Sequence, residues 1–177
     1  MKTLIYSFDG ISGSGADTIE SDETYCGMPF FRKMTRNANE LEICRRLQLH
    51  PHPNIVNIYR VGPNFVDMER VVPCHFLKQY NVYSVWKDMT RALRHMQTHG
   101  IYYIDWKYDN IGKTMDIRED TFKLFDFDVS GIYEGDVKRW SYEPPRYFAY
   151  KMASAYYSEP RMIDNYAFYK GIIYRSD

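Results

Sequence analysis

The chain has 177 residues, of which 45% are hydrophobic and 17% aromatic, so it is long and apolar enough to bury a core. Its 23 Lys and Arg residues balance 23 Asp and Glu residues, which excludes a broadly charged surface for nucleic acid or membranes. Three scattered cysteines match neither a disulfide framework nor a zinc spacing, and no apolar run reaches the length of a membrane span. We therefore expect an intracellular protein, cytoplasmic or nuclear, with neither nucleic acid nor membrane as a partner.

The start of the chain predicts a loop, a strand and a helix. Residues 10–28 are rich in Gly, Ser, Thr and Asp, a composition typical of a long loop. MPFFRKM (28–34) indicates a short strand. In ANELEICRRLQL (38–49) apolar residues recur at helical spacing, and either Asn37 or Asn39 can cap the helix.

Two strands and a second helix follow. Residues 50–61 are punctuated by proline and then β-branched, which predicts a loop that leads into a strand. Residues 63–72 predict another strand, paired with the first across the turn at Gly62. Residues 83–100 form an amphipathic pattern that ends at a glycine, as helices often do. The face of this helix that we expect in the core carries Trp86, Met89, Leu93 and Met96.

Two short apolar strands, predicted at 101–105 and 121–127, are followed or ended by polar residues. Asn110 and Asp126 lie near the ends of this predicted hairpin. A carboxamide and a carboxylate that converge from two strands suit Mg²⁺, which prefers oxygen ligands and takes further ones from water and phosphates.

Asp105 and Lys107 stand beside this pair of oxygen ligands in the same polar segment, YIDWKYDN. A positioned carboxylate can accept the proton of a hydroxyl group. A nearby ammonium group can neutralise a phosphoryl group during its transfer. The set therefore favours phosphoryl transfer, in which positioning and charge neutralisation supply most of the catalysis.

With these motifs the chain resembles the eukaryotic-type protein kinases. YIDWKYDN stands where that family has H-R-D-L-K-P-E-N, and LFDFDVSG stands where it has the D-F-G segment. HPNIV, FVDMERV, YEPPR and DNYAFYKGIIY occur in the family's order. The resemblance implies an α+β, two-lobed kinase-like fold in a single domain, 1–177. It would have a small β-rich N-lobe (1–70) and a truncated, mainly helical C-lobe (71–177).

The resemblance also implies a role for each residue of the polar segments. Asp105 would be the catalytic base and Lys107 the contact to the γ-phosphate. Asn110 and Asp126 would be the magnesium ligands. ATP and Mg²⁺ would be the cofactors.

The nucleotide-binding residues follow from the same resemblance. Lys33 would hold the α- and β-phosphates, and Glu40, or in its place Glu42, would be its helix partner. Alternatively, Lys33 and Glu40 are surface charges, as most Lys and Glu residues are. The remaining contacts would be Gly13 and Gly15 in the phosphate-covering loop, Met68 as gatekeeper, and the backbone from Glu69 to Val71 as adenine hinge.

Several positions depart from the family pattern. Tyr103 and Ile104 replace the His and Arg of the catalytic loop, so we expect no dependence on an activation-loop phosphate. Only six residues separate Lys33 from Glu40, far fewer than in the family, which argues against their ion pair. Asp128 replaces the D-F-G glycine, and its carboxylate would either assist metal binding or repel phosphate.

The end of the chain suggests a shortened kinase. Arg146 replaces the Glu of A-P-E, and the chain stops soon after the predicted helix of Asp164, so the usual Arg partner of that Glu is missing. A compact kinase of this kind is one that a large DNA virus would carry. We expect a protein partner to cover an exposed apolar face that carries Tyr156, Tyr157, Phe168 and Tyr169.

The favoured function is ATP- and magnesium-dependent phosphoryl transfer to Ser or Thr of a protein substrate. Lys107 favours Ser/Thr because tyrosine kinases of this family usually lack a lysine there. Two alternatives stay open. The chain could be a pseudokinase or decoy that modulates another kinase or its substrate, or a small-molecule kinase of the same superfamily, in which Asp-Phe-Asp occurs.

Overall fold

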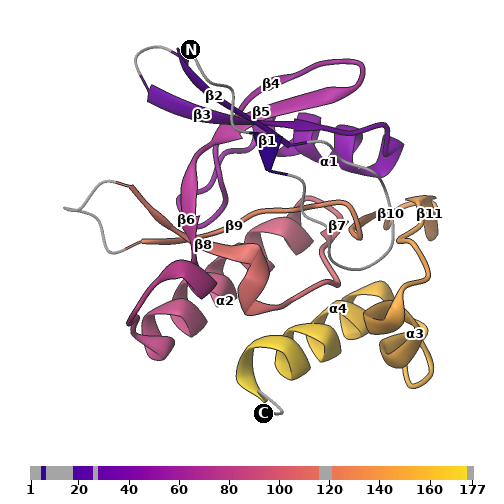
Figure 1. The fold of residues 1–177 in the computed structure, drawn as a ribbon. Helices are drawn as coiled ribbons and strands as arrows, with labels where there is room; N and C mark the ends of the chain where they lie inside the picture. The colour runs from indigo at the N-terminus through magenta and orange to yellow at the C-terminus, as the bar shows by residue number, and fades with distance from the viewer. Residues whose placement is uncertain (1–4, 7–17, 26–27, 116–120, 175–177) are drawn as a thin grey trace.

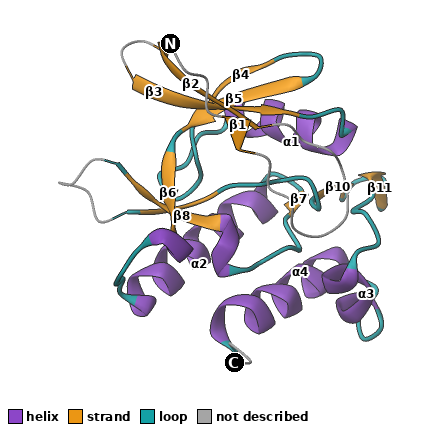
Figure 2. Cartoon of the chain, in the orientation of Figure 1, coloured by secondary structure: helices purple, strands orange, loops and turns teal. Residues whose placement is uncertain are grey.

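The structure, a computed structural model, describes residues 5–6, 18–25, 28–115 and 121–174. These residues form three small antiparallel sheets and four α-helices, a mixed α+β architecture (Figure 1). The largest sheet lies at one end of the molecule and most helices lie below it (Figure 2). Its strands, in spatial order, are β1 (Ile5–Tyr6), β2 (Thr18–Tyr25), β3 (Met28–Met34), β5 (Phe65–Glu69) and β4 (Ile58–Val61).

Strand β2 corrects the expectation of one long loop over residues 10–28. Thr18 pairs with Lys33 and Tyr25 with Met28, so the backbone of β2 finds its partners on β3. A composition rich in Ser, Thr and Asp describes the side chains but not the backbone pairing, which here decides the structure. The predicted glycines of the phosphate-covering loop, Gly13 and Gly15, lie outside the described residues.

Helix α1 (Ala38–Leu49) has the predicted bounds and packs beside the large sheet (Figure 1). Of the two candidate caps, Asn37 is the one used: its Oδ1 accepts from the backbone N–H groups of Asn39 and Glu40 at 3.0 and 3.3 Å. The buried face of the helix carries Glu40, Leu41, Ile43, Cys44 and Leu47.

Strands β4 and β5 pair antiparallel across the predicted turn at Gly62. The strand predicted at 63–72 is interrupted, however: β5 ends at Glu69, and β6 (Val71–Pro73) belongs to a different sheet. This second sheet has the order β6-β8-β9, with β8 at Ile111–Thr114 and β9 at Phe122–Leu124. The chain therefore leaves the large sheet at residue 70.

Helix α2 (Val82–Thr98) follows the 3₁₀ turn η1 (Cys74–Phe76) and packs against β7 and β9. Met89, Leu93 and Met96 are buried as predicted, but Trp86 is 41% exposed, so its assignment to the core was wrong. Val85 is fully buried in its place. At the start of α2 the residue that faces the core is thus Val85 and not Trp86. Val85 lies four residues before Met89 and eleven before Met96, so the three share one face of the helix.

The third sheet has the order β11-β10-β7, from β7 (Ile101–Tyr102), β10 (Gly131–Glu134) and β11 (Arg139–Tyr142). The strands predicted at 101–105 and 121–127 are both shorter than expected. The strands β7 and β9 end at Tyr102 and Leu124. Two residues later, Ile104 and Asp126 have φ values of +69° and +63°, which do not fit an extended backbone. The predicted strand residues beyond these points form loops that carry the candidate site.

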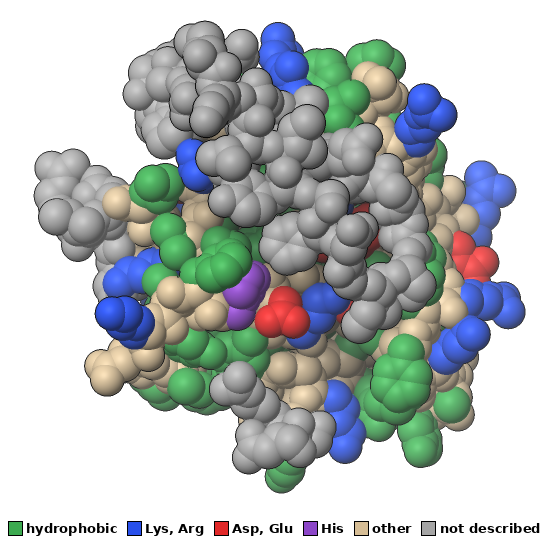
Figure 3. All heavy atoms as spheres, in the orientation of Figure 1, with side chains coloured by type: hydrophobic (Ala, Val, Ile, Leu, Met, Phe, Trp, Pro, Cys, Tyr) green, Lys and Arg blue, Asp and Glu red, His purple; other side chains and the backbone are tan. Residues whose placement is uncertain are grey.

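The chain ends in α3 (Phe148–Ser154), α4 (Pro160–Phe168) and the π-helical turn η3 (Tyr169–Ile173). Tyr156 is 73% exposed and Tyr169 is 48% exposed, whereas Phe168 is 7% exposed, so its assignment to an exposed face was wrong. Phe168 packs edge-on against Trp106, with 4.9 Å between ring centroids. Hydrophobic side chains are visible over the lower part of the molecule in Figure 3. A partner for this face stays a prediction.

One apolar core extends from α1 and the large sheet to α2 and α4. The core joins the sheet-rich N-terminal part to the helical part without a gap, and the division into two lobes stays a prediction. No helix within the described ranges has the length and apolar character that crossing a bilayer requires.

Candidate active site

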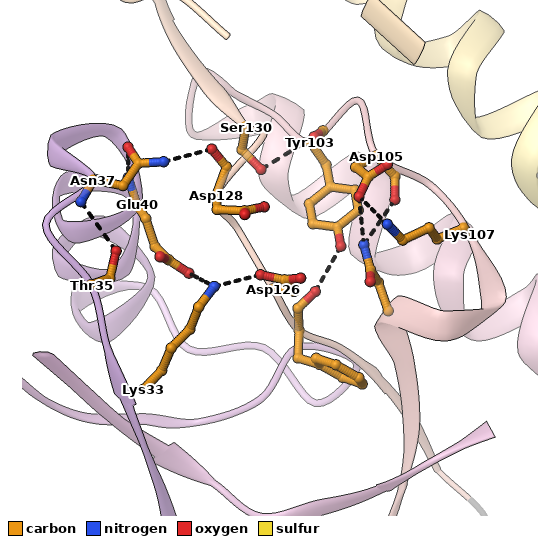
Figure 4. Close-up of polar contacts among 12 residues, drawn as sticks. Lys33, Thr35, Asn37, Glu40, Tyr103, Asp105, Lys107, Asp126, Asp128 and Ser130 are labelled. Atoms are coloured by element: carbon orange, nitrogen blue, oxygen red, sulfur yellow. Dashed lines mark hydrogen bonds and ion pairs between the residues drawn. The ribbon is translucent and has the colours of Figure 1, made fainter. Parts of the chain in front are cut away.

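The segment between β7 and β8 brings three predicted residues together. Oδ2 of Asp105 accepts from Nζ of Lys107 at 2.7 Å and from Nδ2 of Asn110 at 2.9 Å. Although burial opposes it, the Asp105 carboxylate raises the pKa of Lys107, so the ammonium form is favoured. Asp105 and Lys107 lie side by side in Figure 4. The segment thus places a base, a cation and an amide within hydrogen-bond distance.

This segment rests on a buried carboxylate from α4. Oδ1 of Asp164 accepts from the backbone N–H of Ile104 at 3.0 Å and from Nε1 of Trp106 at 2.7 Å. Its Oδ2 accepts from Gln97 at 3.0 Å, and burial raises the pKa of Asp164. The positive φ of Ile104 is costly for a β-branched residue, and such a conformation persists only where its surroundings impose it. Asp164, which binds the N–H of that residue, is therefore a positioning residue for Asp105.

The C-terminal turn η3 also packs against this segment. A Cβ atom added to Gly171 would lie 1.6 Å from the carbonyl oxygen of Trp106, so only glycine permits this approach. The hydroxyl of Tyr108 donates to the carbonyl of Ile172 at 3.2 Å. Helix α4, through Asp164, and η3, through Gly171 and Ile172, thus both contact the segment 104–108.

Tyr103, which stands where the family has histidine, links this segment to the one after β9. Its hydroxyl donates to the carbonyl of Phe125 at 2.7 Å, and its own carbonyl accepts from Oγ of Ser130 at 3.2 Å. Its ring packs edge-on against Phe127 and Trp106. Burial raises the pKa of Tyr103, which keeps the hydroxyl a neutral donor.

Lys33 forms the second group of the site. Its Nζ lies 2.7 Å from Oε1 of Glu40 and 2.5 Å from Oδ1 of Asp126, and in Figure 4 it points between the two carboxylates. Lys33 and Glu40 are both buried, so they are not surface charges. Against the cost of burial, Asp126 and then Glu40 raise the pKa of Lys33.

The expectation that a short spacing would prevent the Lys33–Glu40 pair is therefore wrong. The connection between β3 and α1 is only residues 35–37, and Glu40 follows in the first turn of the helix. A short connection moves the helix start next to the lysine, so the pair needs no longer loop. Glu42, the other candidate, instead lies 3.4 and 3.9 Å from Arg45 and Arg46.

Carboxylates outnumber cations around Lys33. Burial and the neighbouring charge of Asp126 raise the pKa of Asp128 to about 6, while Lys33 opposes this rise. Within the described residues, no group of three or more His, Cys, Asp or Glu side chains could by itself hold a metal ion. Oxygen donors with excess negative charge are of the kind that Mg²⁺ prefers, and Asn110 and Asp126 would be the residues to hold it beside a nucleotide, which stays a prediction.

Comparison with solved structures finds a chain of similar fold. The kinase PK-1 of Cydia pomonella granulovirus aligns with a TM-score of 0.50 and 15% identity, over 67% of this chain and 48% of that chain. The chain resembles part of a kinase fold. It spans about half the length of that protein, and at this identity the likeness concerns the fold alone. No protein-family model and no curated protein matches the sequence.

The predicted hinge, Glu69 to Val71, connects the large sheet to the sheet of β6, β8 and β9. Met68 is buried on β5, and Val71 begins β6. The carboxylate of Glu69 accepts from Nζ of Lys123 at 2.6 Å and from the backbone and side-chain nitrogens of Asn57 at 3.1 and 3.0 Å. Lys123, on the strand that leads to Asp126, and Asn57 had no signal in the sequence beyond being polar residues in apolar surroundings.

Proposed function

We propose that this chain is a kinase that transfers the γ-phosphoryl group of ATP, with magnesium, to Ser or Thr of a protein substrate. The observation that supports this most is the buried Lys33, held between Glu40 and Asp126 beside the Asp105–Lys107 pair. A buried cation between two carboxylates from separate elements is expensive to assemble and marks a functional site more often than a structural one.

Each residue has a distinct task in this proposal. Mg²⁺-ATP supplies the transferable phosphoryl group and neutralises part of its charge. Asp105 accepts the proton of the substrate hydroxyl, while Lys107 offsets negative charge near the hydroxyl. Lys33 contacts the phosphates, and its carboxylate partners keep it in place and protonated. Asn110 and Asp126 hold the metal.

The choice of a protein hydroxyl rests on the resemblance, in which Lys107 is typical of Ser/Thr kinases. One observation favours a small-molecule substrate instead. Asp128, half-buried beside Asp126, replaces a glycine with a carboxylate, and Asp-Phe-Asp occurs in small-molecule kinases of the superfamily. A decoy that binds another kinase or its substrate would need neither Asp105 nor Lys107 for its effect.

The decisive experiment compares Asp105→Asn with a matched control, Asp136→Asn. Asp136 is an exposed aspartate in the turn before β11, far along the chain from the polar loop. We expect Asp105→Asn to lower the phosphorylation rate by about 10²- to 10⁴-fold, because a general base contributes that much. Its melting temperature and the thermal shift caused by Mg²⁺-ATP should stay those of the wild type.

The assay uses radiolabelled ATP with a generic protein substrate and, in parallel, a panel of small-molecule alcohols. Label on the protein that is lost in Asp105→Asn supports the proposal. Label only on a small molecule moves the chain to the small-molecule branch. No transfer by the wild type, together with a cellular effect that Asp105→Asn retains, contradicts catalysis and favours the decoy.

A further inference from the structure

Helix α1 is fastened to the segment 128–143 at its N-terminus and in its last turn. This segment begins two residues after Asp126 and continues through the β10–β11 hairpin. Nδ2 of Asn37 donates to the carbonyl of Asp128 at 2.7 Å, Nδ2 of Asn39 donates to the carbonyl of Glu143 at 2.7 Å, and Nη2 of Arg46 lies 2.5 Å from Oε1 of Glu134.

Asn37 has two roles in one side chain. Its Oδ1 accepts from two N–H groups at the start of α1, and its Nδ2 donates to Asp128. The oxygen faces two donors and the nitrogen faces an acceptor, so the orientation of the amide is determined. The residue that starts the helix of Glu40 therefore also binds the backbone of Asp128, two residues after Asp126, as Figure 4 shows.

We propose that Asn37, Asn39 and Arg46, the α1 lock, are positioning residues that hold Glu40 and Asp126 on either side of Lys33 without any phosphorylation. The proposal rests on the proposed kinase function. It assigns the lock the task of keeping the helix against the segment, so that both carboxylates reach the same ammonium group. The three side chains are neutral amides or a paired guanidinium, and each bond is present in the unmodified chain.

The hydroxyl groups of the same segment support this independence from phosphate. Ser130 is fully buried and donates to the carbonyl of Tyr103. Ser141 is exposed, and its hydroxyl lies 3.3 Å from the carbonyl of Ile132 and 3.2 Å from Glu134. A phosphate on Ser141 would meet both the carboxylate of Glu134 and the Arg46 guanidinium bound to it, so it would compete for an ion pair that the unmodified chain already has.

The sharpest test replaces Asn37 by Asp. Aspartate caps helices as well as asparagine does, but it cannot donate to the carbonyl of Asp128. The matched control is Asn81→Asp at the start of α2, where Asn81 caps through the same two contacts, at 2.9 and 3.3 Å, and no bond from its Nδ2 is seen among the described residues. Asn37→Ser removes the donor without adding a charge.

Two measurements are made on the full chain. Hydrogen exchange reports opening of peptides that cover 38–49 and 126–134, and steady-state kinetics with Mg²⁺-ATP report kcat and KM. One hydrogen bond changes an equilibrium by about two- to tenfold, so we expect both Asn37 variants to exchange faster in 126–134 and to lose kcat/KM by that factor. Asn81→Asp should match the wild type in both.

A charge exchange tests the other end of the lock. Arg46→Glu and Glu134→Arg should each raise exchange and lower kcat/KM, and the double variant should restore both. The effect should be smaller than at Asn37, because both side chains are about one-third exposed, at 29% and 35%.

Faster exchange and lower kcat/KM in the Asn37 variants, with rescue by the exchanged pair, support the lock. Asn37 variants that match Asn81→Asp in either measurement overturn it, as does a double variant no better than its parents. If the wild type transfers no phosphate, the proposed function fails, while exchange still decides whether Asn37 fastens the helix.

Discussion

The two halves of the candidate site are built in different ways. The half around Asp105 comes from one segment between β7 and β8, and it stands on the buried carboxylate of Asp164. The half around Lys33 draws on two neighbouring elements, β3 and the first turn of α1, and on Asp126, which lies 93 residues after Lys33 and two residues after the end of β9. No single element could assemble it.

This difference indicates how each half would fail. The Asp105 half has its partners built in by local spacing, so it depends on the foundation that imposes the strained backbone of Ile104. The Lys33 half also has one residue with a positive φ, Asp126, and its ion pairs exist only while the large sheet, α1 and the residues after β9 stay together. Damage to α4 should therefore reach Asp105 first, and damage near β9 should reach Asp126 first.

Removal of the Asp164 carboxylate should have the largest effect on stability. Asp164→Ala would leave the buried N–H groups of Ile104 and Trp106 without their acceptor, while Gln97 keeps Asn165, and we expect a cost of about 3 kcal/mol or more of unfolding free energy. Asp164→Asn keeps an acceptor oxygen and should cost clearly less. Urea unfolding followed by circular dichroism measures both. Equal stability of Asp164→Ala and wild type would contradict this foundation role.

On the other half, Asp126→Asn should remove activity but not the fold. Its side chain is 31% exposed and Lys33 keeps its partner Glu40, so we expect little change in melting temperature. Loss of a metal ligand and of one phosphate-site carboxylate should lower Mg²⁺-dependent turnover by about a hundredfold or more. The control is Asp109→Asn, because Asp109 is an exposed aspartate in the segment between β7 and β8. Equal turnover in Asp126→Asn would refute the metal assignment.

A larger side chain at Gly171 in η3 tests whether the C-terminal turn restrains the segment of Asp105. Gly171→Ala would place a methyl group against the carbonyl of Trp106, so we expect a loss of about 1 to 3 kcal/mol in stability and a lower kcat, since Trp106 adjoins Asp105. Gly135→Ala is the matched control, because nothing lies within 4 Å of its added Cβ. Thermal melting and kinetics measure the pair. Identical behaviour of the two variants would show that α4 and η3 do not restrain the segment.

The smallest expected effect is a dependence of stability on pH, through a histidine whose neighbour binds β9. Nδ1 of His52 accepts from the N–H of Asn54, whose side chain donates to the carbonyl of Phe122 on β9. Burial, and then the charges of His95, Arg91 and Lys123, lower the pKa of His52 to about 4.

A histidine with a lowered pKa in the folded state stabilises the fold above its ordinary pKa of 6.5 and less at lower pH. Wild-type stability should therefore fall between pH 6.5 and 4, because the unfolded chain binds a proton that the folded chain resists. His52→Asn keeps an acceptor for Asn54 but cannot titrate, so its melting temperature should depend less on pH in this range. The melting temperatures of both proteins are measured at pH 7.5 and at pH 5. An equal drop in melting temperature for the wild type and His52→Asn would contradict this prediction.

Much of the fold followed from local patterns in the sequence. The bounds of α1, the existence of α2 and the pairing of β4 with β5 all matched, because the period of apolar residues records which face of an element is buried. Asp105, Lys107 and Asn110 lie together because three residues in one short segment are close in any compact folding of that segment, while their roles stay predictions.

The other results depended on partners that are distant in sequence. Lys33 and Asp126 are 93 residues apart, and Ile104 and Asp164 are 60 apart. The sequence around Lys33 even argued against its pair with Glu40, and the helical stripe placed Trp86 in the core. Only tertiary packing brought β3, α1, β9 and α4 together. A polar residue's neighbours in the chain carry no record of its long-range partner, because hydrogen bonds and ion pairs depend on where two elements meet in space.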